Sequence, residues 1–529
     1  MALFDPNAID PYADKDVHWL IRSQAERRGD APFILWEPFS GAEETWTYAR
    51  FYSEVRNVAA GLRDRGIGHG DFVLLHANNC PEFLLTWYAC ALLGAVVVTT
   101  NPRAAVGEMA YFIEHSGVKA AVVEQSFLDL IAETGACFAW IAAIATPETQ
   151  GTALPEGVLP FASLSGDGVA LDLEPLDPIT RISVQYTSGT TSRPKGVVWT
   201  HANVLWGAQV GAAHNQLRSD DCAIVFTPLC HTNAMSWGHF PIVWSGSQMV
   251  LQTKFSASRF WPLAVKHKCT WGNVIPFAMQ AVIAQGIPEQ HSYRHWVVGA
   301  ANIGDLESRL KLSIVGAWGM TETVTHGTWT PPQLPAPMRS MGMPAPEYEI
   351  KIVDDAGLPV AEGQTGNLKI RGKRGRALFL EYLNNPEATA ASFDADGWFD
   401  TGDRVWQSEH GHLRFADRAK DMLKVGAENV AASEIESVIA LVPGVGEVAV
   451  VGRPHPMLDE VPLAFVISPD PGPELAEAIL AKCRHELAGF KVPVDVLFMD
   501  DFPRAELNKV AKKELREIAR SEAAAVANA

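Results

Sequence analysis

Residues 186–196 read YTSGTTSRPKG, and the rest of the chain is best interpreted outward from this stretch. Five of the six residues from 187 to 192 carry hydroxyls around one glycine, and Arg193, Lys195 and Gly196 follow. Small side chains allow backbone N–H groups to turn toward an anion, hydroxyls add donors, and a lysine adds a point charge. The pattern is not a Walker motif, because no GK[ST] follows a glycine at the required spacing. It predicts a phosphate-binding loop, with an ordinary polar turn as the alternative.

On both sides of this loop, helical patterns alternate with short β-branched runs. We expect helices at 50–65, 83–93 and 108–115, and strands at 71–76, 95–100, 120–123, 224–227, 248–251, 271–275 and 296–298. Helices that alternate with apolar strands predict stacked, mostly parallel sheets covered by helices. The apolar stretch 83–98 is shorter than a membrane span and predicts a buried helix that leads into a strand.

The pattern changes from Gly342 onward. Expected strands at 348–353 and 366–371 flank a turn at 354–357, which predicts a small antiparallel or barrel-like unit. After Lys420 we expect helices at 432–440 and 473–487 and strands at 447–452 and 463–467. The predicted fold is therefore α/β, with a large N-terminal domain of residues 1–419 and a small α+β C-terminal domain of residues 420–529. No Gly/Ser linker marks the boundary, which is compatible with a short hinge.

The composition excludes several functional classes. The chain has 529 residues, enough for about three folding units. Its 43 Lys and Arg against 61 Asp and Glu give a net charge of -18, which argues against binding to nucleic acid or to anionic lipid. Seven cysteines without a CxxC disfavour a disulfide framework or a structural zinc site. The acidic N-terminus does not resemble a secretory signal, so we expect a cytoplasmic protein without a membrane span.

The loop at 186–196 resembles the corresponding loop of the adenylate-forming family of acyl-CoA synthetases, luciferases and nonribosomal-peptide adenylation domains. Four further segments resemble the other motifs of that family, in the same order: GAWGMTE at 316–322, GWFDTGD at 397–403, RAKDMLK at 418–424 with 428–429 and 433–436 beyond it, and PRAELNK at 503–509. The resemblance implies an AMP-forming acid–CoA ligase that uses ATP, Mg²⁺ and coenzyme A. An acid would attack the α-phosphorus of ATP and release pyrophosphate, and the CoA thiol would then displace AMP.

The same resemblance implies a nucleotide site. Its residues are Thr187, Ser188, Gly189, Thr190, Thr191, Ala317, Trp318, Asp403 and Arg418. Trp318 stands where the family usually has tyrosine, so we expect its indole against the adenine, with a buried core residue as the alternative. Asp403 is expected to accept hydrogen bonds from the ribose hydroxyls, with Arg418 as a nearby donor. Glu322 is the expected Mg²⁺ ligand, with Thr321 and the catalytic Lys195 beside the phosphates, because magnesium favours hard oxygen ligands. A solvated loop carboxylate is the alternative for Glu322.

The resemblance also implies a moving C-terminal domain that rotates at Lys420. In one pose Lys509 would bridge the attacking carboxylate and the α-phosphate, and in the other the loop after the hinge would serve thioester formation. The expected hinge and CoA residues are Lys420, Lys424, Gly426 and Ala427. Ala427 replaces a glycine of many relatives and could crowd the thiol path. A stand-alone adenylating enzyme that passes the acyl group to an amine or a separate carrier protein therefore stays open as an alternative.

The acid pocket is expected near 228–237, whose sequence PLCHTNAMSW resembles the segment beside the acyl site. His231 would stand at its mouth, with a structural histidine as the alternative. The expected pocket residues are His231, Asn233, Met235, Trp237, Gly299, Ala300, Ala301, Gly316, Ala317 and Met320. They predict a largely apolar pocket for a branched, alicyclic or aryl-substituted acid, such as an arylacetic or 2-arylpropionic acid. The segment order also resembles carnitine-type ligases, although no acidic residue stands here to pair with a trimethylammonium group.

Other readings of the chain are weaker. A carnitine– or fatty-acid–CoA ligase stays open as an alternative substrate class. A catalytically inactive nucleotide or acyl sensor is disfavoured, because Lys509, Glu322, Asp403, Arg418 and Thr190 are all retained. The expected partners are a small carboxylic acid, ATP and CoA, in a monomer or homodimer that binds no nucleic acid.

Overall fold

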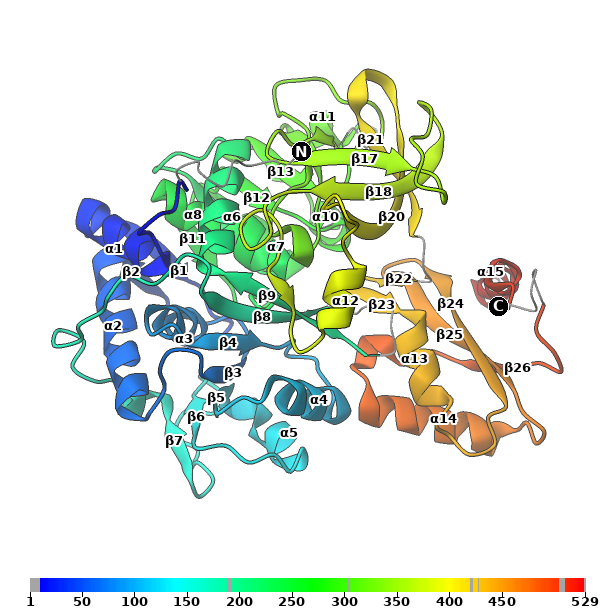
Figure 1. Ribbon diagram of the computed structural model, residues 1–529, viewed down its shortest axis with the longest axis horizontal. Helices are drawn as coiled ribbons and strands as arrows, with labels where there is room; N and C mark the ends of the chain where they lie inside the picture. The colour runs from blue at the N-terminus through cyan, green and yellow to red at the C-terminus, as the bar shows by residue number, and fades with distance from the viewer. Residues whose placement is uncertain are drawn as a thin grey trace.

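The computed structural model describes residues 10–187, 193–301, 305–418, 422–426, 428–503 and 510–527. Figure 1 shows the chain passing from N-terminal helices in blue, through stacked sheets in cyan to yellow, to a C-terminal portion in orange and red. In these described ranges, no helix has the length and apolar character needed to cross a bilayer. The expected boundary at 419/420 lies outside the described residues and stays a prediction.

The phosphate-loop hairpin belongs to a sheet with the strand order β19-β9-β8-β4-β3-β5-β6-β7. Pairing is parallel from β8 through β4 to β7 and antiparallel between β8, β9 and β19. Thr187 ends β8 and pairs with Lys195, which begins β9, so the hairpin places both ends of the loop at one edge of the sheet. The strands are β3 (Phe72–His76), β4 (Val96–Thr99), β5 (Ala120–Glu124), β6 (Ile141–Ile144), β7 (Val158–Pro160), β8 (Arg181–Thr187), β9 (Lys195–Thr200) and β19 (Glu381–Tyr382).

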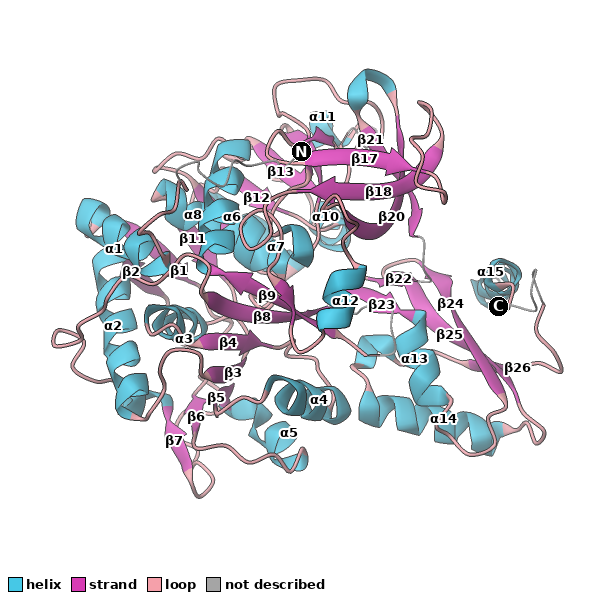
Figure 2. Ribbon diagram, in the orientation of Figure 1, coloured by secondary structure: helices cyan, strands magenta, loops and turns pink. Residues whose placement is uncertain are grey.

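Helices cover both faces of this sheet, as the predicted alternation requires (Figure 2). Alternate strand residues face different cores: Val97 packs in the core that contains α3, and Val98 packs in the core that contains α4. The helices of the N-terminal portion are α1 (Val17–Arg28), α2 (Tyr48–Asp64), α3 (Pro81–Leu92), α4 (Val106–Ser116), α5 (Leu128–Glu133), α6 (His201–His214), α7 (Thr232–Ala234), α8 (Phe240–Ser245), α9 (Ala257–Lys266), α10 (Pro276–Ala284), α11 (Leu306–Leu310) and α12 (Pro386–Ala391). The prediction of a mostly parallel α/β fold is confirmed.

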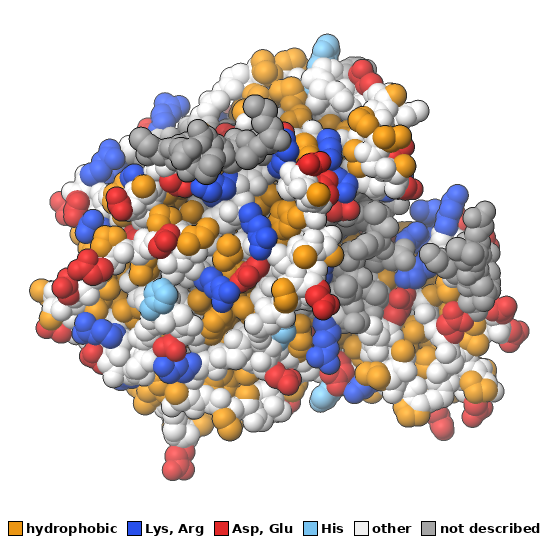
Figure 3. Space-filling view, in the orientation of Figure 1, with side chains coloured by type: hydrophobic (Ala, Val, Ile, Leu, Met, Phe, Trp, Pro, Cys, Tyr) orange, Lys and Arg blue, Asp and Glu red, His pale blue; other side chains and the backbone are white. Residues whose placement is uncertain are grey.

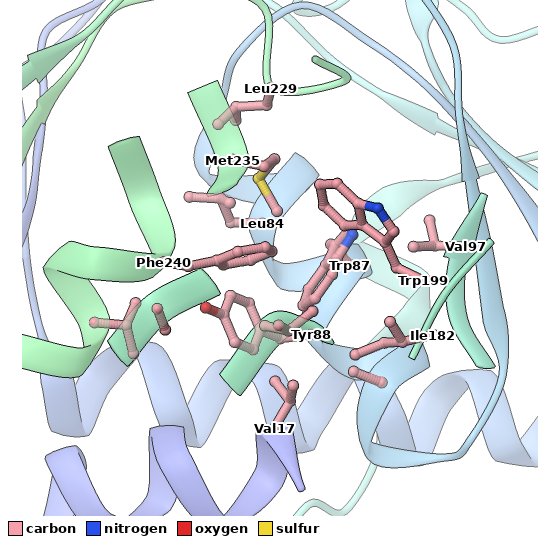
Figure 4. Packing of buried hydrophobic residues seen from close by; sticks show 14 of the residues in the cluster. Val17, Leu84, Trp87, Tyr88, Val97, Ile182, Trp199, Leu229, Met235 and Phe240 are labelled. Carbon is pink, nitrogen blue, oxygen red and sulfur yellow. The ribbon is translucent and has the colours of Figure 1, made fainter. Parts of the chain in front are cut away.

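Large aromatic side chains fill the core between the first sheet and the helices (Figure 4). Trp87 of α3 packs on Phe240 of α8 with ring centroids 5.3 Å apart, and Trp199 of β9 lies 6.4 Å from Phe240. Every residue of α3 except Glu82 is buried, and Pro81 begins the helix with a backbone angle that already suits it. The apolar stretch 83–98 is therefore a buried helix followed by a strand, as its length predicted.

Two further sheets of the N-terminal portion are built from the strands that do not belong to the first sheet and precede β17. The second has the order β10-β11-β1-β2, and the third has the order β12-β13-β14-β15-β16. Their strands are β1 (Pro32–Trp36), β2 (Glu44–Thr47), β10 (Cys222–Val225), β11 (Gln248–Leu251), β12 (Trp271–Asn273), β13 (His295–Val298), β14 (Ser313–Trp318), β15 (Thr328–Trp329) and β16 (Met343–Pro344). β12 is shorter than the expected strand 271–275 because Ile275 is the N-cap of α10 and Pro276 begins that helix.

The segment from Gly342 onward forms an antiparallel sheet in the order β17-β18-β20-β21. Its strands are β17 (Glu349–Val353), β18 (Thr365–Arg371), β20 (Phe399–Gln407) and β21 (Leu413–Arg418). The expected strands at 348–353 and 366–371 correspond to β17 and β18, which pair antiparallel. This sheet places the motif residue Asp403 within β20, in register with Arg418 of β21.

The C-terminal portion has its own sheet and its own buried core. β23, β22, β25 and β24 are neighbours in that order, and β26 pairs with β25. The strands are β22 (Met422–Val425), β23 (Glu428–Ala431), β24 (Glu447–His455), β25 (Asp459–Ile467) and β26 (Val496–Phe498), and the helices are α13 (Ala432–Ile439), α14 (Pro473–Glu486) and α15 (Lys512–Ala527). This portion is α+β, as predicted. Gly426 lies between β22 and β23 with a φ of 62°, a left-handed conformation that favours glycine.

Candidate active site

A cavity of about 730 Å³ lies where the first sheet, the β17–β21 sheet and the C-terminal portion meet. Its volume falls within the roughly 300–1,000 Å³ that is usual for ligand sites. Lys195, Glu322 and Asp403 line it from the N-terminal portion, and Glu428 and Lys491 line it from the C-terminal portion. On the molecular face seen in Figure 3, acidic and basic side chains are interspersed with hydrophobic ones. The described residues of the predicted motifs, such as Lys195, Glu322 and Asp403, thus reach one shared cavity from distant parts of the sequence.

Glu322 is held at the cavity wall by a tyrosine. The Tyr382 hydroxyl donates a hydrogen bond of 2.8 Å to Glu322 Oε1, and both residues are buried. Burial, together with the nearby carboxylate, raises the pKa of Tyr382 far above its usual value, so the phenol keeps its proton and acts as a donor. Lys195 Nζ lies 4.5 Å from the centre of the Tyr382 ring. Sequence reasoning predicted Glu322 and Lys195 and missed Tyr382, whose only local signal is its place just before the helix start Asn385–Pro386.

Thr321 is fixed through both its backbone and its side chain. The Trp199 indole N–H donates to the Thr321 carbonyl oxygen at 2.9 Å, and Thr321 Oγ1 lies 3.0 Å from Thr232 Oγ1. The Thr232 hydroxyl is also 3.0 Å from Gln185 Oε1 on β8. This chain of bonds joins the predicted phosphate segment to the predicted acid segment. Connected hydrogen bonds of this kind hold their members in one geometry.

Trp318 and Asp403 form a direct pair. The Trp318 indole N–H donates a hydrogen bond of 2.8 Å to Asp403 Oδ2, and both side chains are buried. Asp403 lines the cavity, whereas Trp318 lies behind it. A Cβ on Gly327 would come within 2.8 Å of the Trp318 ring, so the ring occupies space that only a glycine leaves available. In this pose the indole orients the aspartate, which is a role that sequence reasoning did not predict.

The acid end of the cavity contains part of the predicted set. His231, Asn233, Trp237 and Met320 line it, and Met235 is buried in the adjoining core. Trp237 belongs to a π-helical turn, Met235–His239, and π-helical turns are frequent at functional sites. The Trp237 ring packs edge-on against His326, with centroids 4.4 Å apart. His326 was not predicted from the sequence.

The other predicted pocket residues lie away from this surface. Gly316 faces the backbone of Ser340, because a Cβ there would come within 2.1 Å of the Ser340 carbonyl oxygen. Ala301 is buried and bridges to Ser340, and Ala317 pairs with Trp329. Gly299 is exposed and Ala300 is partly exposed. Gly316 and Ala317 belong to β14, the other three follow β13, and none of the five lines the cavity formed by the described residues.

Glu428, which follows the predicted hinge, contacts the N-terminal portion at the cavity. Its Oε1 accepts a hydrogen bond of 3.1 Å from Asn101 Nδ2 and lies 3.3 Å from His231 Nε2 and 3.5 Å from Arg103. Burial would raise the pKa of Glu428, but the adjacent His231 outweighs it and lowers that pKa to about 2. Burial would lower the pKa of His231, but Glu428 outweighs it and raises that pKa. The pair therefore favours the ionised form of both groups.

A second ionic contact joins the two portions beside the same cavity. Lys491 Nζ lies 2.5 Å from Glu108 Oε1 on α4 and 2.8 Å from Glu434 Oε1 on α13. All three side chains are buried, and Glu108 Oε2 also accepts the Ala105 N–H at the start of α4. Burial disfavours the Lys491 ammonium, but the two carboxylates outweigh this and raise its pKa. Neither Lys491 nor Glu108 was predicted, because isolated charged residues carry no motif.

Several predicted residues lie outside the described residues, namely Ser188, Gly189, Thr190, Thr191, Lys420, Ala427 and Lys509. Arg418 is described by its backbone alone, in register with Asp403. Thr187 lines the cavity at the end of β8. Lys424 is exposed on β22, with its Nζ 5.4 Å from the Phe415 ring, and does not line the cavity in this pose.

Two family models together match most of the chain. The family described as AMP-binding enzyme matches residues 21–383, and the AMP-binding enzyme C-terminal domain matches residues 434–509. A crotonobetaine/carnitine–CoA ligase of Proteus mirabilis is 33% identical over 500 residues, which cover 91% of this chain and 95% of that protein.

Solved structures give the same result for the fold. An anthranilate CoA ligase, AuaEII, solved with anthranoyl-AMP, is 26% identical with a TM-score of 0.72 and covers 98% of this chain and 100% of its own. An o-succinylbenzoate CoA synthetase of Bacillus subtilis, bound to a product analogue, has a TM-score of 0.80 at 24% identity and covers 94% of this chain and 98% of its own. The second likeness concerns the fold alone.

Proposed function

Because this chain belongs to the AMP-binding enzyme family, as an AMP-forming acid–CoA ligase, we propose that the 730 Å³ cavity serves both half-reactions on a compact carboxylic acid. ATP and CoA are the co-substrates of this family. The observation that carries the proposal is that Lys195, Glu322 and Asp403 line the same cavity as His231 and Glu428. Residues of the nucleotide motifs and a residue of the segment after the hinge thus face one reaction space.

We assign the first half-reaction to the end of the cavity that contains Glu322. An acid oxygen attacks the α-phosphorus of ATP, the bond to the bridging oxygen breaks, and pyrophosphate leaves. Lys195 offsets the negative charge of the phosphates, and Asp403 holds the ribose. The Glu322 carboxylate, oriented by Tyr382, offers the hard oxygen that Mg²⁺ prefers, and Mg²⁺ bound there would offset phosphate charge. Lys509 is assigned to the α-phosphate by the sequence motif alone.

We assign the observed pose to the second half-reaction. The Glu428 contact with His231 and Asn101 places the segment after the hinge against the acid end. There the CoA thiol would attack the acyl carbonyl, and AMP would leave with the electron pair of the broken C–O bond. A domain division at 419/420, with rotation at Lys420, would exchange this pose for the one that delivers Lys509. Two successive poses also limit the access of water to the reactive acyl-adenylate.

The acid itself is proposed from the walls of the cavity. Trp237 and Met320 offer flat and flexible apolar surfaces, and His231 stands at the mouth. These side chains support a ring-bearing or branched acid, such as an arylacetic acid. The similarity to crotonobetaine/carnitine–CoA ligases supports a betaine as the alternative, since aromatic faces also bind quaternary ammonium groups.

A panel of acids with two separate readouts tests the proposal. Benzoates, arylacetates, 2-arylpropionates, alicyclic acids, fatty acids, carnitine and crotonobetaine are supplied with ATP and Mg²⁺, and pyrophosphate release and acyl-CoA mass are measured with and without CoA. We expect both products from one acid class, and neither from Lys509→Ala. Pyrophosphate release without thioester formation would mean that the enzyme passes the acyl group to an acceptor other than CoA. If no acid releases pyrophosphate while ATP binds, the ligase proposal fails.

A further inference from the structure

The turn from Asn233 to Gly238 separates the cavity from a group of buried polar side chains. Asn233 and Trp237 line the cavity on one side of this turn. A Cβ placed on Gly238 would lie 3.5 Å from the Asn233 carbonyl oxygen and 3.7 Å from Asn273 Nδ2. The Asn273 carboxamide therefore lies directly behind the wall of the acid end.

Asn273 is buried without hydrogen bonds to its side chain. It is 9% exposed, and within the described part of the chain neither its Oδ1 nor its Nδ2 has a partner. Leaving a buried donor or acceptor unbonded is costly, so most such groups in native proteins are bonded. Gln252 has the same unbonded amide elsewhere in the described residues, so it is the position of Asn273 behind the acid end, together with its two unbonded atoms, that marks this side chain as a candidate ligand-binding group.

Other polar atoms around Trp237 in the described residues are likewise buried without a hydrogen-bond partner. Among the described residues, Trp237 Nε1, His326 Nε2 and Thr325 Oγ1 are buried without partners. They are close together, because the Trp237 and His326 rings touch, and a Cβ on Gly319 would meet both the Trp237 ring and the Thr325 backbone. Donors and acceptors therefore gather on the far side of Trp237, where sequence reasoning expected an apolar pocket.

The group is electrically neutral. Burial, together with the neighbouring His214, holds the pKa of His326 well below its usual value, so the His326 ring is uncharged. The nearby carboxylate of Glu347 already pairs with His214 Nε2 at 3.2 Å. Neutral donors and acceptors match an uncharged hydrogen-bonding group better than they match a cation.

We propose that the acid substrate carries an uncharged hydrogen-bonding substituent, a hydroxyl or a carbonyl, remote from its carboxylate, and that this substituent binds the Asn273 carboxamide. This inference rests on the proposed function and specifies its substrate class. Asn273 is both a donor and an acceptor, so either substituent can form a bond to it. Asn273 does not line the cavity in this pose and lies behind the turn from Asn233 to Gly238, so binding requires that turn to shift.

Matched acids that differ by one hydroxyl test this inference. The pairs are 4-hydroxyphenylacetate with phenylacetate, 4-hydroxybenzoate with benzoate, and 4-hydroxycyclohexanecarboxylate with cyclohexanecarboxylate. In at least one pair we expect the hydroxylated acid to have a kcat/KM for pyrophosphate release at least about tenfold higher, because a site built around polar groups rejects the analogue that leaves them unbonded. A preference for the plain acid in every pair that reacts would overturn the inference.

Asn273→Leu separates recognition from a purely structural role. In this variant we expect the ratio of kcat/KM for the hydroxylated acid to that for the plain acid to fall to about one, because only the hydroxylated acid reacts more slowly. Without acid, the variant protein should melt at the same or a higher temperature than the wild type. Gln252→Leu is the matched control, because Gln252 is also buried with an unbonded amide in the described residues but does not line the turn at Gly238. An unchanged preference in Asn273→Leu, or an equal loss in Gln252→Leu, would contradict the assignment.

A binding measurement keeps the test independent of turnover. Calorimetry with the sulfamoyl-adenosine analogues of the best matched pair should show about tenfold tighter binding of the hydroxylated analogue to the wild type and equal binding of both to Asn273→Leu. His326→Phe keeps an aromatic ring but removes both ring nitrogens, including the Nδ1 that lies 3.4 Å from His214 Nδ1, and it should weaken binding of the hydroxylated analogue more than binding of the plain one. If the acids are activated but Asn273 does not discriminate, this inference fails and the ligase function stands. If no acid is activated, the ligase function itself fails.

Discussion

The two ends of the cavity differ in how completely their polar groups are bonded. At the nucleotide end, Glu322 accepts a bond from Tyr382, Asp403 accepts one from Trp318, and the Thr321 backbone accepts one from Trp199. At the acid end, the described side chains of Asn273 and His326 retain unbonded buried atoms. One end has its geometry set by protein contacts before any ligand binds, whereas the other depends on the ligand for part of its bonding.

This difference corresponds to two tasks of the enzyme: handling ATP, which is the same for every acid, and recognising the acid, which differs from one substrate to another. Every acid that the enzyme activates meets the same ATP, so groups fixed in advance serve all reactions and lose no free energy to reorganisation. Discrimination among acids instead requires groups that only the correct acid satisfies. The comparison predicts that substitutions at the nucleotide end reduce all activity, and that substitutions at the acid end change which acid is used.

The largest effect is expected from removing the carboxylate of Glu322. Glu322→Ala should lower pyrophosphate release by about 10²–10³-fold with every acid, because charge stabilisation at the phosphates is lost. Glu381→Ala is the matched control, since that neighbouring glutamate pairs with Arg181 in a partly exposed ion pair and should lose little. A Glu322→Ala variant that stays active with one acid and not with another would contradict the proposed separation of the two ends.

A smaller effect is expected from Tyr382→Phe, which removes only the hydroxyl that orients Glu322. We expect about a tenfold rise in the Mg²⁺ concentration needed for half-maximal pyrophosphate release, since hydrogen bonds to charged groups are worth about 1.5–3 kcal/mol. Calorimetric titration of Mg²⁺ into the ATP-bound enzyme gives the same quantity without turnover. Tyr293→Phe removes another buried tyrosine hydroxyl away from the cavity and should leave the Mg²⁺ requirement unchanged.

The contact between the two portions should affect one half-reaction only. Glu428→Gln removes the charge that faces His231 and should slow thioester formation about fivefold, equivalent to roughly 1 kcal/mol, and leave pyrophosphate release intact. Rapid-quench measurement of both products in one reaction checks this. Equal slowing of both half-reactions would mean that Glu428 serves the structure rather than the pose.

The same contact predicts a pH dependence. His231 has a raised pKa in this pose. Its ion pair with Glu428 therefore stabilises the pose fully below the ordinary pKa of about 6.5, and this stabilisation is lost as the pH rises through the raised pKa. Glu428, with its pKa lowered to about 2, stays ionised throughout that range. The ratio of thioester formation to adenylation should therefore fall as the pH increases above about 6.5, and Glu428→Gln should remove this fall.

The smallest effect is expected from Trp318→Phe. The aromatic ring is retained and the N–H bond to Asp403 is lost, so the KM for ATP should rise about threefold with little change in kcat. Trp271→Phe, a buried tryptophan that does not line the cavity, serves as the control. A fall in kcat without a change in KM would exclude a role in positioning the ribose group.

The sequence was sufficient to predict the α/β architecture, since apolar strands that alternate with helices have few other arrangements. It also predicted the cavity residues that belong to contiguous motifs, such as Lys195, Glu322 and Asp403. It could not predict Tyr382, Asn101 or Lys491, because each acts through a partner that is distant in sequence. It also could not show that Trp318 would turn its N–H toward Asp403, since residue type does not specify side-chain orientation.

The acid pocket shows a different limit. The small residues Gly299, Ala300 and Ala301 led us to expect apolar pocket walls, yet none of them lines the cavity: Gly299 is exposed with open space around it, and Ala301 is buried against Ser340. Small residues satisfy tight packing and pocket walls equally well, so composition cannot distinguish the two roles. The sequence also could not show that, among the described residues, the Asn273 side chain has no hydrogen-bond partner, because this depends on the positions of all the polar groups around it.

Lys491 and Glu434 both belong to the C-terminal portion, and only Glu108 belongs to the other side of the interface. If that portion rotates during each turnover, Lys491 moves together with its counter-ion Glu434. Glu108 stays behind and still accepts the Ala105 N–H at the start of α4. Both Lys491 and Glu108 then keep one of the partners that they have in this pose, so neither charge is left without a contact when the two surfaces separate.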